Sequence, residues 1–288
     1  MEINGKSVMI TGGARIGSSV AVWLAQRGAR NFILTYNSSK TIMQQTAREL
    51  SELGADVSLY QMDATKESAV NTTVDAALNK YGQIEILINM ASVYKARNIG
   101  SITFADWRED LDSNATSTLL CMMALAPKMV QQGEGRIINF ADWTVASRRV
   151  NYPSHATYYA AKHAVIGLTE AFALEYAPKV LINCIAPGPI IPPPDLSIEE
   201  SNAIAEQTPI KKWGGAEEIA EAVGFFIRTN FVTGECLRVD GGRHLWRTRV
   251  IDQRLFHHQM NVGAAEDGRG AGLAARLEGG ARQPRQPP

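Results

Sequence analysis

The chain has 288 residues, of which 45% are hydrophobic and 20% charged, a composition that predicts a globular protein with a sizeable core. Its 29 basic and 29 acidic residues give no net charge, so no general basic field exists to attract nucleic acid or an anionic membrane. The three cysteines are far apart, which disfavours a disulfide or zinc framework. We find no signal peptide and no apolar run of the roughly 18 residues that a membrane-spanning helix needs. We therefore expect a soluble, cytoplasmic protein without a metal site.

Taken in chain order, short apolar runs alternate with longer amphipathic stretches from residue 6 to about residue 240. Strands are predicted at residues 7–11, 31–35, 57–61, 86–89, 136–140, 181–186 and 236–239. Helices are predicted between them, among others at residues 18–27, 41–53, 67–80, 115–130, 156–176 and 217–226. This alternation indicates βαβ units with right-handed crossovers. We expect an α/β fold, with a doubly wound parallel sheet in a single domain and ligands at the carboxyl ends of the strands.

Two later segments break the alternation. Residues 187–195 are proline-rich and predict a loop, and residues 197–208 then predict a short polar helix suited to be a lid over the site. Beyond about Leu245 the chain is rich in Gly, Ala, Arg, Gln and Pro, with little apolar periodicity. We expect a folded domain over residues 1–245 and a disordered tail over residues 246–288. An Arg-rich binding arm is the less favoured alternative, because acidic residues are interspersed.

A glycine-rich turn joins the first predicted strand to the first predicted helix. Residues 11–17 read Thr-Gly-Gly-Ala-Arg-Ile-Gly, at the strand–helix junction where a dinucleotide-binding turn belongs. Glycines there let the backbone approach a pyrophosphate, whose charge lies at the helix N-terminus. The alternative is a plain tight turn.

Tyr158 and Lys162 stand four residues apart in the predicted helix at residues 156–176, so their side chains lie on one face. An ammonium group this close favours the phenolate and is expected to lower the pKa of the tyrosine from about 10 towards neutrality. Such a phenol can deliver a proton to a carbonyl or imine at ordinary pH. The pair alone is a weak signal, because the spacing recurs by chance in many helices.

Several short motifs follow one another in order along the chain: Thr11-Gly12, Asn89-Met90-Ala91-Ser92, Asn114, Tyr158-x-x-x-Lys162 and Pro187-Gly188. The ordered set resembles the short-chain dehydrogenase/reductase family over roughly residues 3–245. The resemblance implies a Rossmann-type domain of about seven parallel strands and a nicotinamide cofactor. It also implies hydride transfer involving a small-molecule substrate, and a homodimer or homotetramer.

The resemblance implies roles for single residues as well. Tyr158 matches the catalytic acid/base, Lys162 the residue that binds the nicotinamide ribose, and Asn114 the residue that helps hold a proton-relay water. Without the family, Asn114 is equally well explained as a helix-kink residue. The residues expected to bind the cofactor are Gly12, Arg15, Ile16, Gly17, Asn37, Ser38, Asp63, Asn89, Ala91, Tyr158, Lys162, Pro187, Gly188 and Ile190.

Charge near the second predicted strand indicates which cofactor is used. A site selective for NAD places an acid after this strand to hold the ribose 2′-hydroxyl, whereas this chain has no acid there before Glu49. Arg15 and Lys40 could meet a 2′-phosphate, with Ser38 donating a hydrogen bond, so we predict NADPH over NADH. Asp63, after the third strand, matches the family's adenine-contacting acid, and as an isolated residue it would be a helix cap.

The chain departs from the family pattern at the end of the fifth predicted strand. Most members have a serine there, whereas this sequence has Asp142, and Ser147 and Ser154 lie only in the following loop. An aspartate at this place resembles the pteridine reductases and the dihydromonapterin or dihydrofolate reductases of the family. A carboxyl beside an activated phenol suits proton delivery to a pterin C=N bond. Candidate stacking surfaces for a flat ring are Tyr94, Trp143 and Trp213, and ordinary packing is the favoured alternative for each of them. The alternative is that Asp142 only caps a turn.

The glycine turn is a second departure, because it is one residue shorter than the family turn and lacks the middle glycine. We expect the altered cradle to reduce cofactor affinity. Three functions therefore stay open. The favoured one is an NADPH-dependent reductase of a C=N or C=O bond, with a pteridine-like substrate. The others are a 3-oxoacyl-ACP or other carbonyl reductase in which Asp142 is incidental, and a cofactor-binding homologue with impaired catalysis.

Overall fold

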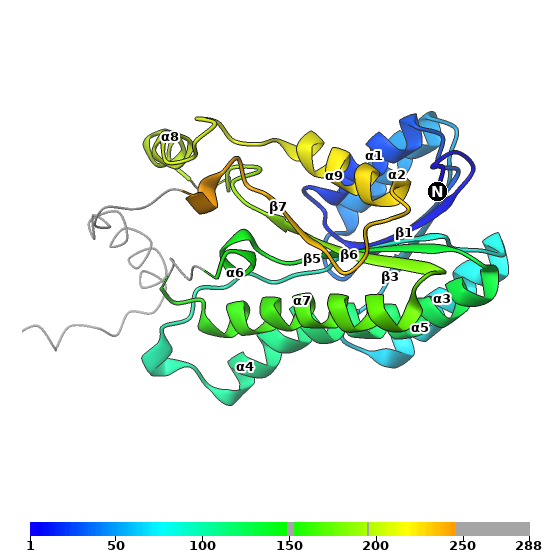
Figure 1. Cartoon of the computed structure of the whole chain (residues 1–288), viewed down its shortest axis with the longest axis horizontal. Helices are drawn as coiled ribbons and strands as arrows, with labels where there is room; N and C mark the ends of the chain where they lie inside the picture. The colour runs from blue at the N-terminus through cyan, green and yellow to red at the C-terminus, as the bar shows by residue number, and fades with distance from the viewer. Residues whose placement is uncertain (149–152, 195, 246–288) are drawn as a thin grey trace, which may run out of the picture. The chain divides into compact units, whose positions relative to one another are not determined.

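The computed structural model describes residues 1–148, 153–194 and 196–245, so the predicted tail lies outside the described residues. Within them, seven parallel strands form one sheet in the order β3-β2-β1-β4-β5-β6-β7 (Figure 1). The strands are β1 (Ser7–Gly12), β2 (Asn31–Tyr36), β3 (Asp56–Gln61), β4 (Ile86–Met90), β5 (Gly135–Phe140), β6 (Val180–Pro187) and β7 (Cys236–Val239). The predicted fold class is confirmed.

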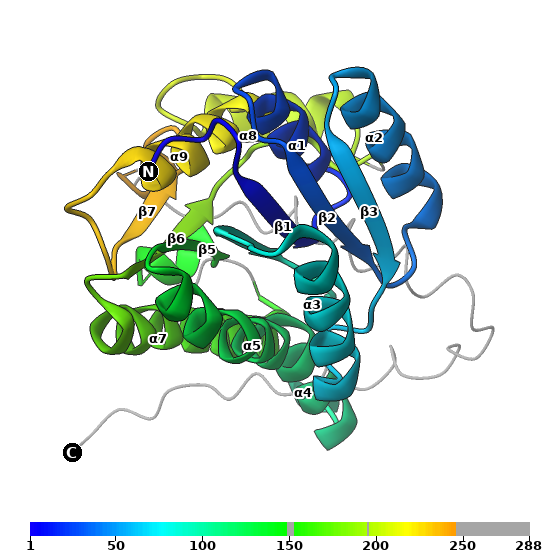
Figure 2. The same ribbon diagram turned by 90° about the vertical axis from the view of Figure 1, so that its right-hand side faces the viewer.

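Helices cover both faces of the sheet (Figures 1 and 2). One face carries α1 (Gly17–Gln26), α2 (Lys40–Glu52) and α9 (Ala216–Arg228), and the other carries α3 (Glu67–Tyr81), α5 (Ser117–Gln132) and α7 (Ala156–Tyr176). The alternation of side chains along a strand explains this arrangement. Val8 and Ile10 pack into the cluster that contains α1 and α9, whereas Met9 packs into the cluster that contains α3 and α5. Both faces are therefore buried, as in other parallel sheets.

The main differences from the predicted elements lie beside the carboxyl edge of the sheet. Helix α4 (Phe104–Leu111) and a π-helical turn (Asp112–Thr116) precede α5, where the sequence predicts one helix from residue 115. A capping box between Thr103 and Asp106 starts α4, which explains why a helix forms over a polar stretch. A short helix, α6 (Trp143–Ala146), follows β5, and α8 (Ile198–Glu206) occupies the predicted lid segment. Both lie towards the same end of the sheet in Figure 1.

The order of the strands reverses direction between β1 and β4, and a ligand crevice forms at such a switch point. Because the strands are parallel, the segments that follow β1, β4, β5 and β6 all leave the sheet at the carboxyl ends of the strands. They carry the glycine turn, residues 91–98, Asp142 and the proline-rich loop. The fold thus gathers the predicted motifs at one end of the sheet. Among the described helices, none is both long and apolar enough to cross a membrane.

Candidate active site

Tyr158 and Lys162 lie in the first two turns of α7, and their side chains are almost fully buried, with exposures of 6% and 2%. The Lys162 Nζ donates a hydrogen bond to the carbonyl oxygen of Phe140 at 2.9 Å and stands 5.7 Å from the centre of the Tyr158 ring. The Tyr158 hydroxyl donates to the Asp142 Oδ2 at 3.3 Å. Three of the four predicted catalytic side chains, Asp142 at the start of α6 and the pair on α7, therefore meet in one place.

The charges around the phenol differ from the sequence-based expectation. Burial, followed by the negative charge of Asp142, raises the pKa of Tyr158 well above its ordinary value, so the expected lowering of this pKa is wrong for this structure. The reason is geometric: the hydroxyl points to a carboxylate, whereas the Lys162 ammonium is bonded to a backbone carbonyl. A phenol in this setting keeps its proton at neutral pH, which suits a group that donates one.

Burial also lowers the pKa of Lys162 from 10.5 to about 8, and this predicts a pH-dependent cost in stability. Between pH 8 and 10.5 the unfolded chain binds more protons at this lysine than the folded chain, so stability rises with pH in that window and the full cost is present below it. The difference between the pKa of Lys162 in the unfolded chain and in the folded chain corresponds to about 3 kcal/mol of unfolding free energy. The lost bond to Phe140 offsets about 1 kcal/mol, so Lys162→Met is expected to be more stable than the parent by about 2 kcal/mol at pH 7.

Chemical denaturation between pH 7 and pH 10 checks this expectation, and the advantage of Lys162→Met should shrink as the pH rises. Lys128→Met is the matched control, because Lys128 is 42% exposed and its ion pair with Asp75 spans 3.8 Å. It should change stability by less than about 0.5 kcal/mol at every pH. The lowered pKa of Lys162 would be contradicted if Lys162→Met were less stable than the parent at pH 7, or if the stability difference between the two proteins did not change with pH.

Asp142 has two sets of contacts, one for each of its carboxylate oxygens. The Oδ1 accepts hydrogen bonds from the Thr144 N–H at 2.8 Å and from the Thr144 hydroxyl at 2.5 Å, and so caps α6. The Oδ2 faces the Tyr158 hydroxyl. Both sequence-based interpretations of Asp142, the turn cap and the neighbour of the phenol, are therefore realised at once. Trp143 is buried, at 6% exposure, with the Arg243 guanidinium 6.0 Å from its ring centre, which makes it a packing residue.

Asn114 is completely buried in the π-helical turn, and its amide makes four hydrogen bonds. The Oδ1 accepts from the Ser92 hydroxyl at 2.6 Å and from the Val93 N–H at 3.3 Å. The Nδ2 donates to the carbonyl oxygens of Val93 at 3.0 Å and Asp110 at 2.9 Å. The side chain thus ties the segment after β4 to the helical turn. A relay water would have to use the main-chain carbonyl, which accepts from the Thr118 hydroxyl at 3.2 Å.

The shortened glycine turn still closes tightly onto α1. Gly12 and Gly13 have φ angles of +66° and +73°, in the left-handed region that favours glycine. A Cβ atom on Gly12 would lie 2.8 Å from the Ala91 Cα, and one on Gly13 would lie 2.8 Å from the Met90 Cβ. The Gly17 N–H donates to the Gly13 carbonyl oxygen at 2.5 Å, and α1 begins at Gly17 after Ile16. Backbone, with no room for side chains, therefore lines this part of the switch point.

Gly12→Ala is expected to weaken cofactor binding by at least about tenfold, because the new methyl group would push against the backbone of Ala91. The matched control is Gly5→Ala, at a φ of +79° with no atom within 4 Å of its Cβ position, which carries only the backbone strain of about 1 kcal/mol. Titration with NADPH, followed by melting temperature, measures both. If NADPH raises the melting temperature of both variants as much as that of the parent, the glycine turn does not bind the cofactor's pyrophosphate.

The predicted adenosine side of the site lies after β2 and β3. Asn37, Ser38 and Lys40 are exposed. The Asp63 Oδ1 accepts from the N–H and the hydroxyl of Thr65, at 3.0 and 2.7 Å, so this carboxylate caps a turn.

The Arg15 side chain of the glycine turn contacts the backbone of residues 191 and 192. Its Nη2 donates to the carbonyl oxygen of Pro192 at 2.7 Å and of Ile191 at 3.4 Å. It therefore links the turn to the segment that follows β6.

The predicted nicotinamide side is formed by close backbone packing. A Cβ on Gly188 would lie 2.5 Å from the Asp240 Cβ, and the Gly188 N–H donates to the Val239 carbonyl oxygen at 2.9 Å. Ile190 is buried and Pro187 is half-buried. The strands beneath are tied by the Asn89 amide, which donates to the Asn139 Oδ1 at 2.9 Å. Gly188 thus has a steric reason to be a glycine.

Comparison with known proteins agrees with this layout. A family model described as Enoyl-(Acyl carrier protein) reductase matches residues 13–244. The chain is 29% identical to the 3-oxoacyl-[acyl-carrier-protein] reductase FabG of Staphylococcus epidermidis, over 83% of this chain and 99% of that protein. It is 31% identical to the 3-oxoacyl-[acyl-carrier-protein] reductase of Synechocystis, over 81% of this chain and 95% of that one.

Solved structures give the same result. A short-chain dehydrogenase/reductase from Serratia marcescens superposes with a TM-score of 0.78 at 28% identity, over 85% of this chain and 100% of that one. The matched region includes strands β2 to β7, the glycine turn from Gly13 and the Tyr158–Lys162 pair, and β1 lies just before it. The chain therefore belongs to the short-chain dehydrogenase/reductase family and is an oxidoreductase of that type.

Proposed function

We propose that the chain is an NADPH-dependent reductase that acts on the C=N bond of a pteridine-like substrate. The observation that carries this proposal is the carboxylate of Asp142 at 3.3 Å from the Tyr158 hydroxyl. An ionised carboxylate would repel the oxyanion that develops when a ketone is reduced. The amino-pyrimidine edge of a pterin instead offers N–H donors, which a carboxylate accepts well.

The residues of the chain fit a nicotinamide dinucleotide at the switch point, since Gly12 and Gly13 leave no room for side chains there. Bound NADPH would supply the hydride. Tyr158, whose raised pKa keeps the phenol protonated, would give its proton to the ring nitrogen of the substrate. The Lys162 ammonium, 5.7 Å from the ring centre, would then balance the charge of the phenolate. Asp142 would hold the substrate edge beside the phenol.

The preference for NADPH is proposed from the residues after β2. Asn37, Ser38 and Lys40 are exposed and can meet a 2′-phosphate, and the sequence places no acid there before Glu49. Arg15 would first have to leave the carbonyl oxygens of Ile191 and Pro192. The remaining predicted cofactor residues are proposed to bind as the family resemblance implies. Comparable dissociation constants for NADPH and NADH would contradict the preference.

A carbonyl reductase is the second candidate, because the two curated relatives are named 3-oxoacyl-[acyl-carrier-protein] reductases. In that case the cap that Asp142 provides to α6 would be its whole role. A third possibility is a homologue whose short glycine turn no longer supports catalysis. It predicts no rise in melting temperature with NADPH, whereas a ligand at 100 times its dissociation constant adds about 2.7 kcal/mol.

The test is a screen of NADPH oxidation by the full chain over dihydropterins, dihydrofolates, quinones and β-ketoacyl thioesters. The proposal predicts turnover of dihydropterins above all others. Turnover of thioesters alone would favour the second candidate. No turnover, together with no NADPH-induced rise in melting temperature, would favour the third.

We also propose a cytoplasmic homodimer or homotetramer. Large apolar side chains on α4, α5 and α7 are exposed, namely Phe104 (74%), Met123 (50%) and Leu174 (85%), and packing of these helices against a second copy would bury them. Light scattering on the purified chain would give the mass, and a monomer at all concentrations would contradict the assembly.

A further inference from the structure

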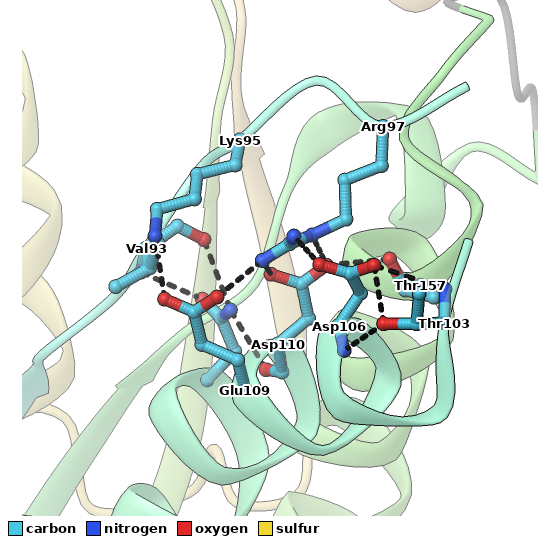
Figure 3. Close-up of polar contacts among 9 residues, drawn as sticks. Val93, Lys95, Arg97, Thr103, Asp106, Glu109, Asp110 and Thr157 are labelled. Atoms are coloured by element: carbon cyan, nitrogen blue, oxygen red, sulfur yellow. Dashed lines mark hydrogen bonds and ion pairs between the residues drawn. The ribbon is translucent and has the colours of Figure 1, made fainter. Parts of the chain in front are cut away.

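A buried carboxylate on α4 belongs to no part of the site described so far. Asp110 is 0% exposed. Its Oδ2 accepts a hydrogen bond from the Arg97 Nε at 3.0 Å and another from the Thr157 hydroxyl at 2.5 Å (Figure 3). A buried charge is costly unless it is paired and hydrogen-bonded. The Asp110 carboxylate therefore holds the side chains of Arg97 and Thr157 in place. Thr157 is the residue directly before Tyr158.

Arg97 joins the segment after β4 to α4 and to the residues just before α7. Its guanidinium also contacts the carboxylates of Asp106 and of Glu109 (Figure 3). Its backbone N–H donates to the Ser154 carbonyl oxygen at 2.5 Å, just before α7. The side chain is 12% exposed in the ion pair with Asp110. Arg97 therefore holds one end of the stretch of residues 93–97.

The other end is held at Val93, whose N–H and carbonyl oxygen both bond to the Asn114 amide, at 3.3 and 3.0 Å. Asn114 in turn donates to the Asp110 carbonyl oxygen at 2.9 Å. Tyr94 lies between the two fixed positions. A loop residue held on both sides keeps its orientation better than an exposed aromatic side chain normally would.

Tyr94 faces the candidate active site. Its ring is stacked on His155, with centres 4.3 Å apart and planes 13° apart, and it meets the Tyr158 ring edge-on at 4.8 Å. The side chain is still 56% exposed. An aromatic ring beside the proton donor, partly open and fixed in orientation, is suited to bind a flat substrate.

We propose that Asp110 and Arg97 are positioning residues, whose buried ion pair fixes the Tyr94 ring as a substrate-binding wall beside Tyr158. The same carboxylate holds Thr157, so one group sets both the wall and the first turn of the helix that carries the phenol. This inference rests on the proposed function, in which a flat heterocycle is reduced next to Tyr158. It predicts that Asp110 acts on substrate affinity only through Tyr94.

A double-mutant cycle between Asp110→Asn and Tyr94→Ala tests the coupling, with 7,8-dihydrobiopterin and acetoacetyl-CoA as probes and assays well below each melting temperature. Each single variant should raise the KM for the pterin by about tenfold, while the NADPH dissociation constant stays within about twofold. The double variant should be no worse than Tyr94→Ala alone. Effects on KM that multiply, or an unchanged KM in Asp110→Asn, would overturn the proposal.

Glu109→Gln is the matched control, since it also removes a carboxylate from Arg97, yet Glu109 is 42% exposed and bonds to Lys95 as well. Its KM should stay within about twofold of the parent. If Asp110→Asn does not fold, Arg97→Lys keeps a positive charge beside Asp110 but loses the guanidinium contacts with Asp106 and Glu109. It should raise KM in the same direction, and an unchanged KM would count against the proposal.

If the parent protein reduces neither probe, the proposed function fails and the positioning is read from hydrogen exchange instead. The amides of residues 92–97 should exchange about tenfold faster in Asp110→Asn than in the parent, and Glu109→Gln should leave them unchanged. Equal exchange in Asp110→Asn and the parent would show that the ion pair does not hold this segment.

Discussion

Tyr158→Phe is expected to lower kcat by about 10²–10⁴-fold, the range for loss of a positioned general acid. The substitution removes only the hydroxyl from a ring that is 6% exposed, so packing should be kept. The pKa of the phenol is raised well above its ordinary value by burial and by Asp142, hence no charge is lost at neutral pH. The loss should therefore fall on proton delivery.

The measurement is NADPH oxidation at saturating substrate, combined with an NADPH binding titration. The dissociation constant should stay within about twofold, because the hydroxyl is assigned to the substrate and not to the phosphates. Tyr159→Phe is the control, since Tyr159 is the next residue of α7 and is 4% exposed. Turnover retained by Tyr158→Phe would show that Tyr158 is not the proton donor.

Asp142→Asn is expected to reduce pterin turnover by about 10²-fold and to leave ketone reduction unchanged or improved. The amide keeps an oxygen that can cap α6 and accept from Thr144, but it loses the charge that we propose to face the substrate edge. Asp142→Ser introduces the hydroxyl that most family members carry here, so it should favour ketones further. Parallel assays with dihydrobiopterin and acetoacetyl-CoA give the ratio of the two activities.

Thr144→Val controls for the cap, because it removes one of the two hydrogen bonds to the Asp142 Oδ1 and leaves the carboxylate in place. It should lower stability by about 1 kcal/mol and change both activities alike. Equal losses of pterin and ketone reduction in Asp142→Asn would remove the argument for a pteridine substrate and leave the cap as the function of Asp142.

The fold could be predicted because its signals are local. Most strands are short apolar runs, and the long helices between them are amphipathic stretches. The sequence could not show where side-chain polar groups point. Tyr158 and Lys162 lie on one helix face, as their spacing requires, yet the Lys162 Nζ bonds to Phe140 and the phenol to Asp142. The electrostatics of the pair thus depend on β5, which the spacing does not describe.

The buried ion pair between Asp110 and Arg97 could not be predicted from the sequence for a related reason. An aspartate in a polar stretch is ordinarily solvated, and nothing in the local pattern marks this one as buried. Its partners stand 13 residues before it and 47 residues after it. The nearest local signal is the spacing of Thr103 and Asp106, which makes a capping box at the start of α4.

The proposed preference for a pterin is tested by comparing kcat/KM for 7,8-dihydrobiopterin and acetoacetyl-CoA in the full chain with NADPH. The Asp142–Tyr158 arrangement predicts a preference for the pterin of at least about tenfold. A preference for acetoacetyl-CoA would contradict it and would assign the site to carbonyl reduction.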